Sequence, residues 1–166
     1  MYPVMQEGEK LHFISDSDGT QPFFELDLLM KKELYQNGRK QGFLAECEKT
    51  GKLYFLKILF TGNLDDTFVQ KESKVQLYSP FIIRIYGGML DRENNRFFTL
   101  IEYRKEQDLS DLIRFGGLGQ YTAEERIRIK HKIVLKILYG IHHYMSMYES
   151  DPIIHRDLKP ENVMAS

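Results

Sequence analysis

The chain has 166 residues, of which 42% are hydrophobic, so it is long enough to bury one sizeable core and is ordinary for a soluble protein. Its 23 basic and 24 acidic residues leave a net charge of −1, so the charge gives no reason to expect nucleic acid or a membrane as a partner. The single cysteine, Cys47, excludes an internal disulfide, and without a signal-peptide pattern or an apolar run near the ~18 residues of a membrane span the sequence predicts a soluble cytoplasmic protein.

The first part of the chain predicts an antiparallel sheet with one helix inserted in it. Residues 1–22 are rich in turn-forming residues and are interpreted as a leader to the domain. Beyond them, β-forming residues recur between glycine-containing or polar turns. The expected strands cover residues 26–35, 43–48, 53–60, 82–89 and 96–103. A helix is expected over residues 65–78, because two acidic residues stand at its start and Pro80 follows its end.

The second part of the chain predicts helices. A short helix is expected over residues 109–115, followed by two glycines. A long helix over 123–148 begins with a capping box formed by Thr122 and Glu125. One face of this helix is an apolar stripe formed by Ile127, Val134, Leu138, Ile141 and Met145, which Ile133 and Ile137 widen. We expect further segments of a larger domain, or a partner, to cover it.

Residues 155–162 read His-Arg-Asp-Leu-Lys-Pro-Glu-Asn, and they fit the H-R-D-x-x-x-x-N pattern of a protein-kinase catalytic loop. This stretch resembles the protein kinase family in its serine/threonine form, because Lys159-Pro160-Glu161 follows the aspartate. The resemblance implies that Asp157 accepts or orients the proton of the attacking hydroxyl and that Asn162 holds a Mg²⁺. Lys159 would offset the charge of the transferring phosphate. Residues 148–152 weakly resemble an insertion of the tyrosine-kinase-like branch of these kinases.

The resemblance implies an α+β fold, with a five-stranded antiparallel kinase N-lobe plus one helix, followed by the first helices of the C-lobe. The expected boundaries are a leader over 1–22, an N-lobe over 23–103 and a hinge, long helix and catalytic loop over 104–166. The implied cofactors are ATP and Mg²⁺, and the implied partner is a protein substrate. An Asp-Phe-Gly segment, which places the principal Mg²⁺ in the family, occurs nowhere in the sequence.

We therefore expect a serine/threonine kinase domain that is incomplete and inactive as this isolated chain. Two alternatives stay open. One is a pseudokinase or binding module that keeps the fold without turnover, and the other is a truncated gene product.

The nucleotide site implied by the resemblance begins at Lys57, in the segment Tyr54-Phe55-Leu56-Lys57 where the family has V-A-I-K. Lys57 would hold the phosphates and pair with Glu72 on the inserted helix, where Glu72 shares a face with apolar neighbours. The phenyl ring of Phe55 replaces a small alanine and would fill part of the adenine pocket. An ordinary edge-strand lysine and a solvated glutamate remain the alternatives.

The glycine-rich loop and the hinge complete the implied site. Gly38 and Gly42 stand at the wrong interval for G-x-G-x-x-G-x-V, so a phosphate-binding role for Gly38 competes with an ordinary hairpin turn. Around the hinge, the Glu102 carbonyl and the Arg104 amide would hold adenine. Asp108 would accept a ribose hydroxyl, or it caps the helix that follows.

Overall fold

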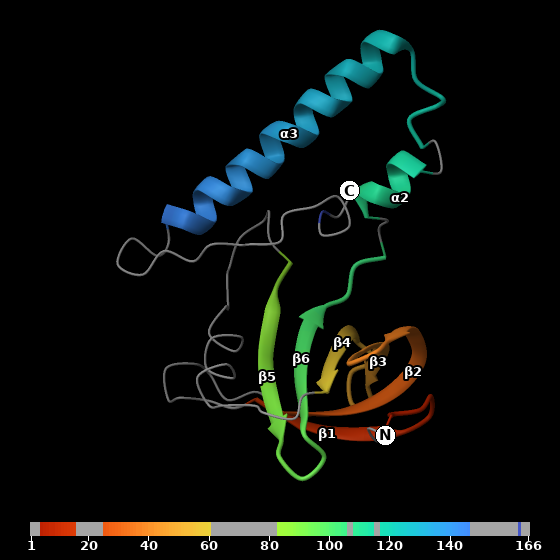
Figure 1. Ribbon diagram of the computed structural model, residues 1–166, viewed down its shortest axis with the longest axis vertical. Coiled ribbons are helices and arrows are strands. Elements are labelled where there is room, and N and C mark those ends of the chain that lie inside the picture. Colours follow the sequence, from red (N-terminus) through yellow and green to blue (C-terminus); the bar gives the residue numbers. More distant parts are fainter. Residues whose placement is uncertain are drawn as a thin grey trace. The chain divides into compact units, whose positions relative to one another are not determined.

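The computed structural model describes residues 4–15, 25–60, 83–105, 108–114, 117–146 and 163. The chain divides into two compact units, one formed by Met1–Leu77 with Ile83–Tyr103 and the other by Tyr78–Ile82 with Arg104–Ser166. Among the described residues, the first unit carries the strands and the second carries the helices, so the expected α+β class is confirmed (Figure 1). The expected helix over 65–78 lies outside the described residues.

The strands of the first unit form one antiparallel sheet in the order β1-β2-β3-β4-β6-β5. They are β1 (Lys10–Ile14), β2 (Glu25–Asn37), β3 (Lys40–Cys47), β4 (Leu53–Phe60), β5 (Ile85–Asp91) and β6 (Arg96–Glu102). Five of them correspond to the five predicted strands. The sheet therefore has one strand more than the sequence predicted.

The additional strand is β1, which lies within the segment that we interpreted as a leader. Lys10–Ile14 pairs with Glu25–Leu29 of β2, so this part of the segment belongs to the sheet. Phe13 is fully buried between exposed neighbours, which is the period-two alternation of a half-buried strand. The sequence contains this alternation, but it is short and lies among turn-forming residues, which favoured a leader over a strand.

β1 and β5, which stand at the two ends of the sheet order, also contact each other. The Ile14 amide donates to Met89 Sδ of β5 at 3.3 Å. Ser15 is buried against Gly87, where an added Cβ would lie only 2.8 Å from Ser15 Cβ. Glycine at this position lets the end of β1 approach β5 closely, so the sheet curls upon itself.

A buried glutamine fixes the residues that precede β1. Gln41 of β3 is fully buried, and its amide accepts from the Met5 amide at 3.2 Å and donates to the Met5 carbonyl at 2.8 Å. The same amide nitrogen donates to Glu33 Oε2 at 2.9 Å. Because a buried amide without partners is destabilising, these bonds tie Met5 to the sheet.

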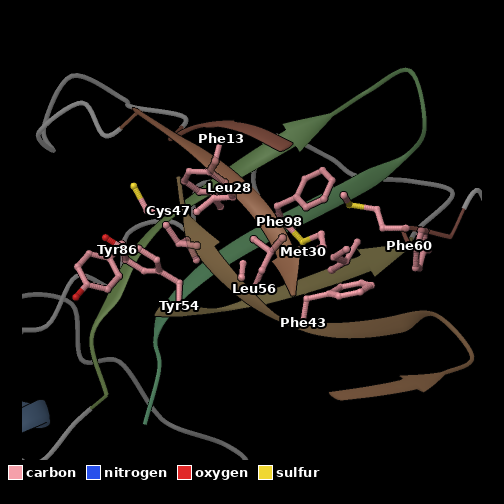
Figure 2. Close-up of a cluster of buried hydrophobic side chains, with 14 residues drawn as sticks. Phe13, Leu28, Met30, Phe43, Cys47, Tyr54, Leu56, Phe60, Tyr86 and Phe98 are labelled. Atoms are coloured by element: carbon pink, nitrogen blue, oxygen red, sulfur yellow. The ribbon is translucent and has the colours of Figure 1, made fainter. Parts of the chain in front are cut away.

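Side chains from one face of the sheet form the hydrophobic core shown in Figure 2. In β4 the core residues alternate with partly exposed ones, and they are Tyr54, Leu56, Ile58 and Phe60. The intervening residues therefore point to the opposite face. Lys57 is one of them.

The second unit contains α2 (Leu109–Arg114) and α3 (Ala123–Ser146), close to the predicted bounds. The predicted capping box of α3 is confirmed. The Glu125 amide donates to Thr122 Oγ1 at 3.3 Å, and the Thr122 amide donates to Glu125 Oε2 at 2.8 Å. Neither described helix is both long and apolar enough to cross a lipid bilayer.

Phe13→Ala should test whether β1 belongs to the folded core. We expect it to lower the free energy of unfolding by about 3–5 kcal/mol, because it removes a fully buried ring. The matched control is Ile14→Ala on the opposite face, where the side chain is 37% exposed and the expected loss is about 1 kcal/mol or less. Urea unfolding measures both, and equal small losses would show that β1 contributes nothing to the core.

The pairing of β1 with β2 should also depend on pH through His12. Its Nδ1 lies 2.7 Å from Asp27 Oδ1 and its Nε2 lies 3.2 Å from Glu25 Oε1. The hydrogen bond to Asp27, directly opposite in the sheet, is the main reason that the pKa of His12 is raised above 6.5. The stabilisation is therefore complete below pH 6.5 and is lost as the pH rises through the folded-state value.

NMR titration of the His12 ring measures this pKa directly. We expect a value above 6.5 that returns toward 6.5 in Asp27→Asn. A wild-type value at or below 6.5 would contradict the charged pairing.

Candidate functional site

Lys57 lies on the face of the sheet that is opposite the core. In register, it stands directly beside Gly42 of β3 and Thr99 of β6. Lys57 is half-buried, and Thr99 is 6% exposed. The lysine therefore places an ammonium group on a partly covered face, next to a position that has no side chain.

Two aromatic residues occupy the same face beside Lys57. Tyr35 of β2 is the cross-strand partner of Gly42, and its ring centroid lies 6.2 Å from that of Phe55 with the planes tilted by 47°. Phe55 precedes Lys57 by two residues and, like Lys57, is half-buried. The ring of Phe55 is thus on the lysine side of the sheet, as the alternation of β4 requires.

Our interpretation of the sequence did not identify Tyr35 as a site residue. The available signal was its distance from the turn, because Tyr35 and Gly42 lie symmetrically about Gly38-Arg39. Residues at equal distances from a two-residue hairpin turn stand opposite each other. Locating that turn in the sequence would have paired the tyrosine with the glycine.

Gly38 lies in the hairpin turn between Asn37 and Lys40, so the alternative of an ordinary hairpin turn describes its structure. Its φ of +54° lies in the left-handed region that favours glycine. A contact between Gly38 and phosphate stays a prediction.

Residues predicted for the hinge lie at and after the end of β6. Glu102 is the last residue of that strand, and its amide donates to the Arg84 carbonyl at 2.8 Å. Arg104 is exposed. In the second unit, Asp108 Oδ1 accepts from the Asp111 amide at 2.8 Å, so Asp108 caps α2 as the alternative interpretation predicted. A contact between Asp108 and ribose stays a prediction.

Four other predicted site residues lie outside the described residues. They are Glu72, Asp157, Lys159 and Asn162. Their roles remain those implied by the sequence motif.

Comparison with known proteins decides the family of this arrangement. A model of the protein kinase domain matches residues 40–166. The chain belongs to the protein kinase family. The six-stranded sheet that the described residues form includes β1 and β2, which precede the matched residues.

The relatives of this kinase domain include serine/threonine kinases. A MAP kinase kinase of Saccharomyces cerevisiae (MKK1/SSP32) is 28% identical over 134 residues, which cover 74% of this chain and 24% of the relative. The serine/threonine-protein kinase RAD53 of the same species is 31% identical over 134 residues, covering 75% and 15%. Aurora kinase of Schizosaccharomyces pombe is 25% identical over 128 residues, covering 74% and 33%. The chain thus spans a third or less of the length of these relatives.

Protein kinases use ATP and Mg²⁺ and phosphorylate proteins. In the family motif V-A-I-K, the lysine contacts the α- and β-phosphates and the alanine precedes it by two residues. Lys57 and Phe55 stand at these positions in this kinase domain. The cation required by the motif is therefore present, whereas the small side chain is replaced by a phenyl ring.

We predict that Lys57→Ala weakens ATP binding about tenfold or more, because it removes a charge-assisted contact to phosphate. Binding of adenosine, which has no phosphate, should not change. Lys52→Ala is the matched control, since the Lys52 Nζ lies 3.0 Å from Tyr86 Oη and over the Tyr54 ring. Phe55→Ala should instead strengthen binding of both ligands.

Isothermal titration of the four proteins with ATP and adenosine provides the measurement. Equal losses in the two lysine variants would contradict the phosphate role of Lys57. Tight ATP binding that Phe55→Ala leaves unchanged would contradict the placement of that ring in the adenine pocket.

Proposed function

We propose that this chain is the nucleotide-binding part of a serine/threonine protein kinase domain. The observation that carries the proposal is the position of Lys57 on the face of the sheet opposite the core, which we call the outer face. Lys57 lies within the segment that matches the kinase family. The relatives that are serine/threonine kinases support the choice of hydroxyl substrate. The run Lys159-Pro160-Glu161 after Asp157 supports the same choice.

Each of the candidate residues would have its own role in the reaction. Lys57, paired with Glu72, would hold the α- and β-phosphates. The Glu102 carbonyl and the Arg104 amide would hold the base, and Asp108 would accept a ribose hydroxyl. Asp157 would take the proton of the substrate hydroxyl. These groups act by positioning and by charge, which is how proteins catalyse phosphoryl transfer.

The remaining roles concern the phosphate charge. Asn162 would hold a Mg²⁺, and Lys159 would offset negative charge on the phosphoryl oxygens. Bound Mg-ATP supplies the γ-phosphoryl group. The hairpin at Gly38 would approach the phosphates through its backbone amides, with Arg39 and Lys40 adding positive charge.

The outer face of the sheet fits phosphate better than it fits the base. Lys57 supplies a cation beside Gly42, where the missing side chain leaves room that the Tyr35 ring occupies. Phe55 and Tyr35 add aromatic rings on the same face. This favours, as a second candidate, a kinase-like binding module with weak nucleotide affinity and no turnover.

A polypeptide of these 166 residues should show no measurable kinase activity, because its sequence contains no Asp-Phe-Gly aspartate to hold the principal Mg²⁺. The purified polypeptide is incubated with Mg-ATP and a generic protein substrate, and incorporated phosphate is measured. Incorporation that disappears in Asp157→Asn would refute this prediction.

A chimera separates the two candidate functions. The activation segment and the remaining C-lobe of a matched relative are fused after residue 166. Phosphate transfer that requires Asp157 would support the enzyme, whereas a folded chimera that binds ATP without transfer would support the binding module.

We also propose that the apolar stripe of α3 is a contact surface for further kinase-domain segments or for a partner. Three of its predicted members, Ile127, Val134 and Leu138, are 53–56% exposed. Leu135 and Tyr139 beside them are also exposed. Large exposed apolar patches mark interfaces or sites of aggregation.

The isolated polypeptide should therefore associate, and Val134→Glu with Leu138→Glu should shift it toward monomer in size-exclusion chromatography. Charge at two exposed positions opposes burial of the stripe without affecting the sheet. Lys132→Glu with Lys136→Glu, on the same helix, controls for added negative charge. A wild-type monomer with one sharp thermal transition would contradict the prediction.

A further inference from the structure

The ring of Tyr35 lies directly on the backbone of Gly42. A Cβ added to Gly42 would overlap Cε1 of that ring, so the ring occupies the space where another residue would have its side chain. The two residues are cross-strand partners, and Gly42 is also the partner of Lys57 in β4. The tyrosine ring therefore lies over β3, next to the strand that carries Lys57, and on the same face of the sheet.

Local packing explains why the ring adopts this position. Glycine in a strand leaves its backbone uncovered, and an aromatic side chain on the neighbouring strand can cover it. Tyr35 remains 37% exposed, so one side of its ring faces outward while the other contacts Gly42. Burial of this hydroxyl-bearing ring raises the pKa of Tyr35.

Tyr35 also lies next to a second aromatic residue, Phe55, on the face of the sheet that carries Lys57. Its ring centroid is 6.2 Å from that of Phe55, within the range of favourable aromatic pairs. Phe55 is the residue that replaces the small alanine of the family motif. The pair therefore covers adjacent parts of β3 and β4 on the approach to Lys57.

The family pattern shows how far this arrangement departs from an open phosphate loop. Placed with its valine at position 42, G-x-G-x-x-G-x-V requires glycine at positions 35, 37 and 40. This chain has Tyr35, Asn37 and Lys40 there, with Gly42 in place of the valine. The large side chain therefore stands at the β2 position, and the facing β3 position has glycine.

We propose that the Tyr35 ring is a barrier that the nucleoside must displace before its phosphates reach Lys57, so that Tyr35 sets the nucleotide affinity of this domain. The proposal rests on the proposed role of Lys57 in nucleotide binding. The contact with Gly42 and Phe55 holds the ring in the closed position, and each binding event must first break that contact. The observed nucleotide affinity is the affinity of the open form multiplied by the fraction of molecules in which the ring is displaced.

Tyr35→Thr removes the ring and keeps a residue that favours strands. We expect it to tighten binding of a fluorescent N-methylanthraniloyl ATP about two- to tenfold, the range that corresponds to one aromatic contact. Tyr35→Phe keeps the ring and should bind as the wild type does. Because the chain has no tryptophan, nucleotide fluorescence can be followed without a competing indole signal.

Gly42→Ala tests the same barrier with Tyr35 retained. The added methyl group would overlap Cε1 of the Tyr35 ring, so the ring would have to shift away from the sheet. This variant should also tighten nucleotide binding. Thermal melts establish that each variant is folded, and the two substitutions provide independent routes to the open face.

Adding Lys57→Ala to each variant separates the possible outcomes. Tighter binding in Tyr35→Thr and Gly42→Ala, with unchanged binding in Tyr35→Phe, supports the barrier. If Lys57→Ala weakens binding but neither substitution strengthens it, the barrier is refuted and the phosphate role of Lys57 stands. If none of the proteins binds the nucleotide, both the barrier and the proposed function are refuted.

Discussion

The alternation of side chains along β4 is the constraint on which the site depends. Every second residue from Tyr54 to Phe60 is in the core, so Lys57 must face the opposite side. A register shift of one residue would bury the lysine and expose Leu56 and Ile58. The hydrophobic core thereby fixes the position of Lys57, for which we propose a phosphate-binding role, together with its neighbours Gly42 and Thr99.

The N-terminal residues strengthen this sheet from its first edge. β1 contributes Phe13 to the core, and Ser15 packs against Gly87 of β5. The Met5 backbone bonds the buried Gln41, which adjoins Gly42 in β3. The residues before β1 are thus bonded through Gln41 to the strand that lies beneath the Tyr35 ring. Substitutions that weaken the packing of β1 should therefore alter the position of β3 at the outer face.

The sequence predicted the parts of the fold that local rules determine. Glycine turns and alternating residues located five strands, and Thr122 with Glu125 located the start of α3. It missed β1 because a five-residue strand gives a weak signal among turn-forming residues. The resemblance to the V-A-I-K segment of the family placed Phe55 beside Lys57. The contact of Tyr35 with Gly42 depends on cross-strand register and on a side-chain rotamer, which residue types do not specify.

Selective labelling of lysine by an acyl-phosphate derivative of ATP tests the central claim most directly, because the probe acylates an amine held near the phosphates. Peptide mass spectrometry would compare Lys57 with Lys52, whose amine is bound to Tyr86. The account predicts preferential labelling of Lys57, reduced by excess ATP and increased in Tyr35→Thr. Labelling of Lys57 no greater than that of exposed lysines, and unaffected by ATP, would contradict it.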